Sequence, residues 1–183
     1  MIDDAAESLG TFQSNQHSGT FGDMGTLSFN GNKIITAGGG GAIITNNSDI
    51  AEKALHLSTQ AKIKHSYRFI HDEIGYNYRM PNINASLALA QLEKIDILLQ
   101  SKRAIHEVYQ SFFEAYPGYD IVDESFGTKS NYWLNVLLVK DTAAKITLIE
   151  KMNERGIMLR PAWDLIPTLR MYQKAYKYNI DNA

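Results

Sequence analysis

The pattern of apolar and polar positions changes near Pro81. Before it, short apolar runs alternate with turns rich in glycine and asparagine, which disfavours long helices. Residues 24–29 and 41–46 are predicted to be strands, because apolar and β-branched residues there are bounded by turn formers. Ser48 is predicted to cap a following helix. The buried stripe of that helix would consist of Ile50, Ala54, Leu55 and Leu57.

After Pro81, apolar residues recur at helical spacing from Leu87 to Phe112. This pattern predicts one long or kinked helix, or two in series, ending near Pro117. A different unit follows, with strands predicted at 119–122 and 132–140 and a helix at 142–155. Gly156 stands where a C′ glycine would end that helix, and residues 157–160 would form a further strand.

This order of strand, strand, helix and strand is typical of a small α+β domain. We therefore divide the chain into residues 1–110, which carry the glycine-rich part and the long helical region, and residues 111–183. The length and composition agree with a globular protein, since 183 residues with 44% hydrophobic side chains are enough to form a hydrophobic core.

Composition excludes several classes of function. The formal net charge of -2 attracts no nucleic acid, and the absence of cysteine excludes disulfides and thiolate metal sites. No apolar run approaches the roughly 20 residues of a membrane span, and the first residues lack a secretory pattern, so we expect a cytoplasmic protein without membrane contact. The histidines show neither i,i+4 pairing nor an HExxH context, so no metal is assigned to His17, His56, His65, His71 or His106.

The stretch SFNGNKIITAGGGG, residues 28–41, places a lysine in a tight turn shortly before four glycines. Its spacing fits neither a Walker-type phosphate loop nor the Gly-x-Gly-x-x-Gly dinucleotide fingerprint. Lys33 is therefore either an ordinary surface charge or a reactive amine beside a buried strand. The glycine run by itself is equally compatible with a plain hairpin.

Four ordered segments make the chain resemble the DegT/DnrJ/StrS family of pyridoxal-phosphate-dependent nucleotide-sugar aminotransferases. They are DDAAESLGT (3–11), GTFGDMGTLSFNGNKIITAGGGGAIIT (19–45), GYNYRMPNINASLALAQL (75–92) and RGIMLRPAW (155–163). The resemblance implies an α/β fold like that of aspartate aminotransferase. Residues 1–110 would be the remainder of a fold type I large domain, and residues 111–183 a truncated small α+β domain.

The resemblance also implies roles for single residues around pyridoxal 5'-phosphate. Lys33 would form the internal Schiff base and, once free, move the proton during amino transfer. Asp4 would keep the pyridine nitrogen protonated, so that the ring acts as the electron sink. Ser28 would donate its hydroxyl to the cofactor phosphate. Glu7 lies where relatives carry Gln or His near the phenolic oxygen; because an ionised Glu would repel a phenolate, it would be protonated or turned away.

Further residues are assigned to the substrate and to a second subunit. Asn77 would reach the cofactor phosphate of the neighbouring subunit of a homodimer, and Arg79 would anchor the same loop or assist with substrate phosphate. Arg160 could meet a carboxylate or diphosphate, and Trp163 could pack on a sugar or base. For Arg160 and Trp163, a surface arginine and an anchoring aromatic are equally compatible interpretations. Tyr132 and Trp133 are interpreted as core residues.

The implied activity is transfer of an amino group from glutamate to a nucleotide-linked keto sugar, in polysaccharide or glycan biosynthesis. Within the family the sequence is nearest to enzymes that aminate UDP-linked 4-keto-6-deoxy-N-acetyl sugars. Relatives are roughly twice as long, so the alternative is a truncated, non-catalytic segment that dimerises or only binds ligand. A sugar dehydratase is disfavoured, because that branch typically carries His where this chain has Lys33.

Overall fold

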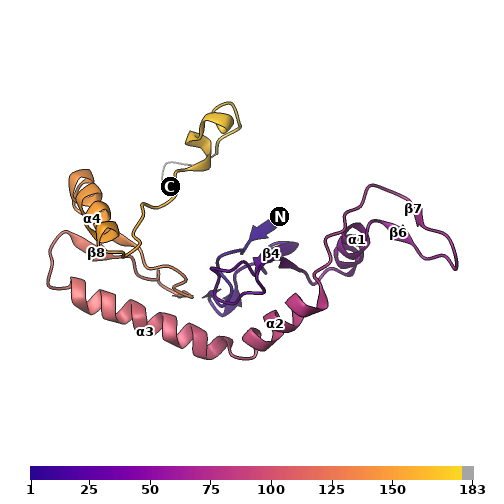
Figure 1. Cartoon of the computed structure of the whole chain (residues 1–183), viewed down its shortest axis with the longest axis horizontal. Coiled ribbons are helices and arrows are strands. Elements are labelled where there is room, and N and C mark those ends of the chain that lie inside the picture. Colours follow the sequence, from indigo (N-terminus) through magenta and orange to yellow (C-terminus); the bar gives the residue numbers. More distant parts are fainter. Residues whose placement is uncertain (179–183) are drawn as a thin grey trace. The chain divides into compact units, whose positions relative to one another are not determined.

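The computed structural model describes residues 1–178 and divides into two compact units (Figure 1). The first comprises Met1–Phe112 and Val122–Asn135. The second comprises Phe113–Ile121 and the residues from Val136 onward. Within the described residues, no helix is long and apolar enough to cross a membrane.

A three-stranded sheet forms the centre of the first unit. It contains β1 (Ile2–Asp4), β4 (Met24–Ser28) and β5 (Gly41–Ile44), in the order β1-β4-β5. β1 runs parallel to β4, whereas β5 is antiparallel to it. The strands predicted at 24–29 and 41–46 are thus confirmed.

Several very short strands were not predicted. β2 (Phe12–Gln13), β3 (Gln16–His17) and β9 (Thr128–Lys129) form a second small sheet. β6 (Lys62–Ile63) and β7 (Ile70–His71) form a hairpin. Two residues are too few to show an alternating pattern, so only the folded chain reveals these pairings.

Helix α1 (Ser48–Ser58) begins one residue earlier than predicted. Its N-cap is Asn47, because Asn47 Oδ1 accepts hydrogen bonds from the backbone N–H groups of Asp49 (2.9 Å) and Ile50 (3.2 Å). The predicted buried stripe is also wrong, since no residue of α1 is buried. The periodic pattern shows which side of the helix is apolar, but not whether other residues pack over it.

The helical pattern after Pro81 corresponds to two helices in series, α2 (Asn82–Leu92) and α3 (Ile95–Phe113). This confirms one of the two predicted arrangements (Figure 1). Pro81 is the N-cap of α2 in extended conformation, as expected for a residue that cannot donate a backbone hydrogen bond.

The second unit pairs β8 (Tyr119–Ile121) with β10 (Leu137–Val139) in antiparallel fashion. Helix α4 (Thr142–Glu154) follows, and Gly156 lies just beyond it with φ +74°. These elements confirm the strand at 119–122, the helix at 142–155 and its glycine stop. Two short 3₁₀ helices, Ile166–Thr168 and Arg170–Tyr172, come after them.

Two predicted strands differ from the structure. Only Leu137–Val139 of the region 132–140 is a strand, because Tyr132 has φ +43°, which is incompatible with an extended chain. Residues 157–160 form no strand; there the Asn153 side chain donates a hydrogen bond to the Leu159 carbonyl at 2.7 Å. A side chain thus satisfies a backbone acceptor that a strand partner would otherwise occupy.

The buried core of the first unit lies directly beneath the turn that carries Lys33. Ile34, Ile35 and Trp133 form its centre, with Ile35 fully buried. The partly buried residues packed against it are Leu9, Phe29, Ile95, Leu98 and Leu99. The residues on either side of the turn are therefore fixed by packing, which holds the lysine backbone in place.

Candidate active site around Lys33

The candidate site lies at the carboxyl ends of β1 and β4. Because these strands are parallel and pair in register from Ile2 with Met24 to Asp4 with Thr26, Asp4 and Ser28 come to the same edge of the sheet. That edge is where open α/β sheets bind ligands. Asp4 Oδ1 accepts a hydrogen bond from Ala6 N–H at 3.1 Å, and the residue is exposed.

Lys33 occupies the turn that follows β4. Its backbone N–H donates to the Asn30 carbonyl at 3.1 Å, which closes the turn. The Lys33 side chain is only 13% exposed, and its Nζ lies 3.0 Å from Glu7 Oε1. The amine is therefore held against a carboxylate, in contrast to a freely solvated surface lysine.

Trp133 forms the other side of the lysine site. The Lys33 Nζ lies 4.1 Å from the centroid of the Trp133 ring, within the range of a cation–π interaction. The indole Nε1–H donates to the carbonyl oxygen of Asn32, the residue before the lysine, at 2.5 Å. Trp133 is 7% exposed, so this contact lies in the core.

Asn131 connects Trp133 to the segment that carries Glu7. Its amide Nδ2 donates to the carbonyl oxygens of Glu7 (2.9 Å) and Leu9 (3.0 Å), and its Oδ1 accepts from Trp133 N–H at 3.0 Å. Sequence analysis assigned no site role to Asn131 or Trp133. The indole bond spans 101 residues, and no local spacing in the sequence signals it.

Ser28 and Lys33 border the same small depression. Ser28 Oγ accepts a hydrogen bond from Asn30 N–H at 3.4 Å, which leaves its own hydrogen to be donated elsewhere. The residues around the depression are Ala6, Glu7, Leu9, Ser28, Lys33 and Ile34. Glu7, which the sequence placed near a cofactor oxygen, directs its carboxylate to the lysine amine.

The donor set fits pyridoxal phosphate by its chemistry. Lys33 supplies an amine for the aldehyde, Asp4 a carboxylate for the ring nitrogen and Ser28 a hydroxyl for the phosphate. These residues follow two adjacent parallel strands, and Lys33 is covered by Glu7 and Trp133.

The other predicted site residues lie in different parts of the chain. Asn77 forms an isolated β-bridge with Thr59 just after α1, and Arg79 is exposed nearby in the sequence. In the second unit, the Arg160 guanidinium lies 5.6 Å from the ring centroid of Trp163. The structure therefore groups Asp4, Glu7, Ser28 and Lys33, and their relation to the substrate residues stays a prediction.

A polar cluster attaches the segment of Trp133 to helix α3. The Tyr132 hydroxyl donates to Asp123 Oδ1 at 2.5 Å, and its ring stacks on His106 with centroids 3.7 Å apart. Arg103 holds both carboxylate oxygens of Glu124 at 3.2 Å and donates to the Ser130 carbonyl at 2.9 Å.

The electrostatics of this cluster agree with its geometry. The hydrogen bond from Tyr132 is the main cause that lowers the pKa of Asp123 to about 2. Burial and then the bond to Asp123 raise the pKa of Tyr132 to about 12. The charged carboxylate and neutral phenol are therefore the favoured forms.

His56, Asp72 and Glu73 form a second group of potential ligand atoms near α1. His56 Nε2 lies 2.7 Å from Asp72 Oδ1, and this hydrogen bond is the main cause that lowers the pKa of the Asp72 carboxyl. Lys53 Nζ lies 2.5 Å from Glu73 Oε1, so an ammonium already neutralises that carboxylate. We interpret the group as a surface ion-pair network.

Comparison with known proteins now decides the family. The model of the DegT/DnrJ/EryC1/StrS aminotransferase family matches residues 1–183. The chain belongs to this family. The chain is 37% identical over its whole length to EpsN from Bacillus subtilis (strain 168), which is named as a pyridoxal phosphate-dependent aminotransferase, and it covers 47% of that protein.

Two further similar proteins agree with this assignment. GDP-perosamine synthase of Vibrio cholerae is 37% identical over 94% of the chain and 47% of its own length. The aminotransferase PseC of Helicobacter pylori, involved in the biosynthesis of pseudoaminic acid, has a similar structure, with a TM-score of 0.88 and 26% identity over 96% of this chain and 48% of PseC. The chain therefore has the α/β fold of about half of a sugar aminotransferase, and it spans about half the length of these relatives.

Proposed function

We propose that this chain carries the catalytic lysine of a pyridoxal-phosphate-dependent aminotransferase acting on a nucleotide-linked keto sugar, with glutamate as the amino donor. The observation that carries the proposal is the placement of Lys33 between Glu7 and Trp133, beside Ser28 and at the sheet edge that also holds Asp4. Membership of an aminotransferase family supports the same reaction class.

When bound, the cofactor supplies an electron sink that stabilises negative charge on the carbon from which a proton is lost. The chain's own contribution is to present the Lys33 amine to the aldehyde and to carry that proton while the amine is free. Asp4 balances the charge of the ring nitrogen, and Ser28 binds the phosphate. In this proposal Arg160, Trp163 and Arg79 contact the sugar nucleotide.

The substrate is proposed to be a sugar linked to a nucleoside diphosphate. Relatives include GDP-perosamine synthases and a UDP-4-amino-4,6-dideoxy-N-acetyl-β-L-altrosamine transaminase of Helicobacter pylori, which is 28% identical over 96% of the chain. The UDP-linked 4-keto-6-deoxy-N-acetyl sugar expected from the sequence is one substrate to assay, and a GDP-linked 4-keto-6-deoxy sugar is the other.

The decisive experiment identifies the bond to Lys33. Incubation of the protein with pyridoxal 5'-phosphate is expected to produce visible absorbance, and borohydride is expected to fix the cofactor mass on the peptide that contains Lys33. Lys33→Ala should abolish both signals and lower amino transfer by at least about 10²-fold, because one amine serves as nucleophile and proton carrier. Lys94→Ala, a change of an exposed lysine on the connection between α2 and α3, is the matched control.

Attachment of the cofactor to a different lysine, or undiminished transfer by Lys33→Ala, would contradict the proposal. A folded protein that takes up no cofactor would instead support the alternative of a non-catalytic segment that only dimerises or binds ligand.

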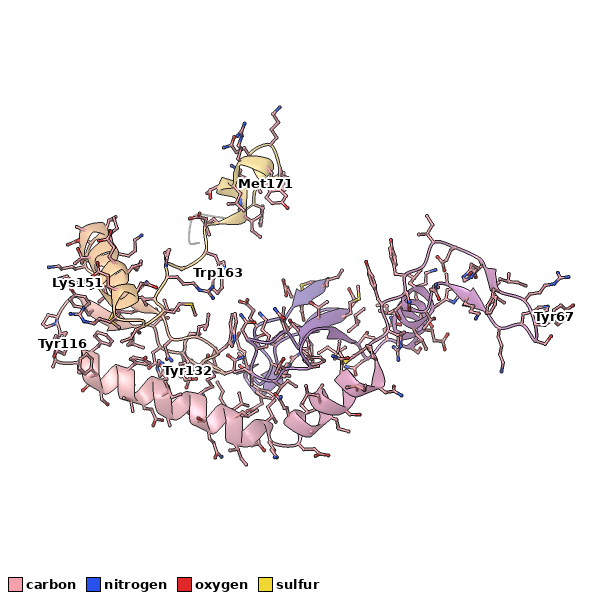
Figure 2. All side chains as sticks on the ribbon, in the orientation of Figure 1. Tyr67, Tyr116, Tyr132, Lys151, Trp163 and Met171 are labelled. Carbon is pink, nitrogen blue, oxygen red and sulfur yellow. The ribbon has the colours of Figure 1, made fainter. Side chains whose placement is uncertain are left out.

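The second part of the proposal is a homodimer in which Asn77 reaches the neighbouring subunit's site. Large apolar side chains on the segment around Asn77 are well exposed in the single chain. They are Tyr67, Phe69, Ile74, Tyr78 and Ile83, and Tyr67 lies at the far end of the β6–β7 hairpin (Figure 2). An exposed apolar surface of this kind supports a protein interface.

A further inference from the structure

We propose that Trp133 is a positioning residue for Lys33, and that Asn131 holds it in place. Together with Glu7 these residues form an amine seat, defined as the Glu7 carboxylate and the Trp133 ring, which receives the Lys33 amine whenever it is not bonded to the cofactor. The inference rests on the proposed function, because it assigns the seat to the free state of the same lysine.

Trp133 restrains both ends of the lysine residue. Its indole N–H binds the carbonyl of Asn32 at 2.5 Å, which fixes the backbone immediately before Lys33. Its ring lies 4.1 Å from the Lys33 Nζ, which fixes the tip of the side chain. A core tryptophan that only filled space would need neither contact.

Asn131 fixes the two halves of the seat relative to each other. It is 6% exposed, and its side chain bonds the Glu7 and Leu9 carbonyls on one side and the Trp133 N–H on the other. Its own N–H donates to Thr11 Oγ1 at 3.1 Å. A buried polar side chain whose bonding groups are used in this way specifies one arrangement of the segments it joins.

The backbone between Asn131 and Trp133 is strained at Tyr132. Tyr132 has φ +43°, a conformation that costs an aromatic residue free energy. This conformation turns the chain so that the Tyr132 side chain binds Asp123 and stacks on His106 of α3. On either side of it, Trp133 binds the lysine turn and Asn131 binds the Glu7 segment. The contacts of Tyr132 with Asp123 and His106 hold this conformation, and it places Trp133 against the lysine and Asn131 against the Glu7 segment.

The test measures how strongly the seat holds the Lys33 amine, in the protein without added cofactor. A small amine-acylating reagent is applied at fixed pH, and modification of the Lys33 peptide is followed by mass spectrometry relative to the exposed Lys94 and Lys145. Acylation requires the amine to leave the ring and the carboxylate. Trp133→Leu, which keeps apolar volume but loses ring and donor, is expected to accelerate labelling of Lys33 about 2- to 30-fold, the range of a cation–π contact.

Trp133→Phe keeps an aromatic face but removes the indole donor, so it should accelerate labelling of Lys33 less than Trp133→Leu does. It is also the more conservative change, so the proposal stays testable if the leucine variant does not fold. The matched control is Leu98→Ala, which removes packing from the same core without a contact to the amine. It should leave the relative labelling of Lys33 unchanged. Equal labelling of Lys33 in the unsubstituted protein and both Trp133 variants, or an acceleration by Leu98→Ala as large as that by Trp133→Leu, would overturn the proposal.

This outcome is independent of the test of function. Labelling needs no cofactor, so the seat can be refuted while borohydride still attaches the cofactor to Lys33. Conversely, labelling of Lys33 could accelerate in the Trp133 variants while no cofactor attaches to Lys33. That result would retain the amine seat and reject the aminotransferase role.

Discussion

Lys33 is positioned by its own turn and by two residues from distant parts of the chain, Glu7 and Trp133. Glu7 follows β1, Asn32 lies in the same turn, and Trp133 comes from the segment after β9. None of these contacts by itself distinguishes a catalytic lysine from a structural one. Their combination holds the amine in a defined place, as the proposed catalytic role requires.

Tyr132 allows a direct test at the residue scale. The pKa of Asp123 is lowered to about 2, below its unfolded value, so its contribution to stability is present above about pH 4 and is lost as the pH falls towards 2. Tyr132→Phe removes the largest cause of that shift. The variant should be about 1 kcal/mol less stable at neutral pH, with a smaller loss of stability between pH 4 and pH 2.

The measurement is urea unfolding across that pH range. At the alkaline end the sign is reversed: the pKa of Tyr132 is raised to about 12, so its contribution is complete below about pH 10 and declines above it. Tyr109→Phe, a change of an exposed residue on helix α3, is the control and should follow the unsubstituted protein. If the free energy of unfolding falls equally between pH 4 and pH 2 in Tyr132→Phe and in the unsubstituted protein, the assigned hydrogen bond is contradicted.

At the scale of elements, the glycines after the lysine turn differ in whether a side chain could replace them. A Cβ at Gly39 would meet nothing within 4 Å. Gly40 has φ +88°, and a Cβ there would come within 2.7 Å of Met80 Cε. A Cβ at Gly41 would come within 2.2 Å of the Leu27 carbonyl oxygen, a backbone atom of the neighbouring strand β4. Glycine is therefore required at two of these three positions, at Gly40 because of its backbone conformation and at Gly41 because of the neighbouring strand.

Three alanine substitutions separate those reasons. Gly39→Ala should change the free energy of unfolding by less than about 0.5 kcal/mol. Gly40→Ala should cost about 1–2 kcal/mol, mainly from the left-handed backbone. Gly41→Ala should cost about 1–3 kcal/mol and weaken the β4–β5 pairing, since backbone must move. Urea midpoints and amide hydrogen exchange of β4 check this series, and equal effects at all three positions would show that the glycines act only through flexibility.

At the scale of the whole molecule, the homodimer proposal predicts complementation between two inactive subunits. If Asn77 serves the neighbouring site, a mixed dimer of Lys33→Ala and Asn77→Ala subunits has one site with both residues intact. Mixing the two variants under exchange should restore part of the amino transfer that each lacks alone. The control mixes Lys33→Ala with a Lys33→Ala, Asn77→Ala double variant, which regenerates no intact site. Absence of recovery, with mixed dimers demonstrated, would place Asn77 in the same subunit's site.

Much of the fold follows from local patterns in the sequence. Helices α2, α3 and α4, strands β4 and β5, and the glycine stop at Gly156 were predicted because periodicity and turn chemistry operate over a few residues. The resemblance of ordered motifs indicated the family and assigned the role of Lys33. The cap of α1 differed by one residue, since Asn47 and Ser48 are both good caps and only the folded backbone shows which one bonds.

The amino-acid sequence by itself therefore determined the long helices and the two strands beside the lysine turn, and through the family resemblance it predicted Lys33 as the amine with Asp4 and Ser28 beside it. The tertiary structure decided which groups surround that amine. Trp133 reaches the lysine turn and Asn131 reaches the Glu7 segment, each across more than a hundred residues, and a left-handed Tyr132 anchored to α3 lies between them. Such contacts arise from packing of distant segments into one core, and no periodicity along the chain encodes them.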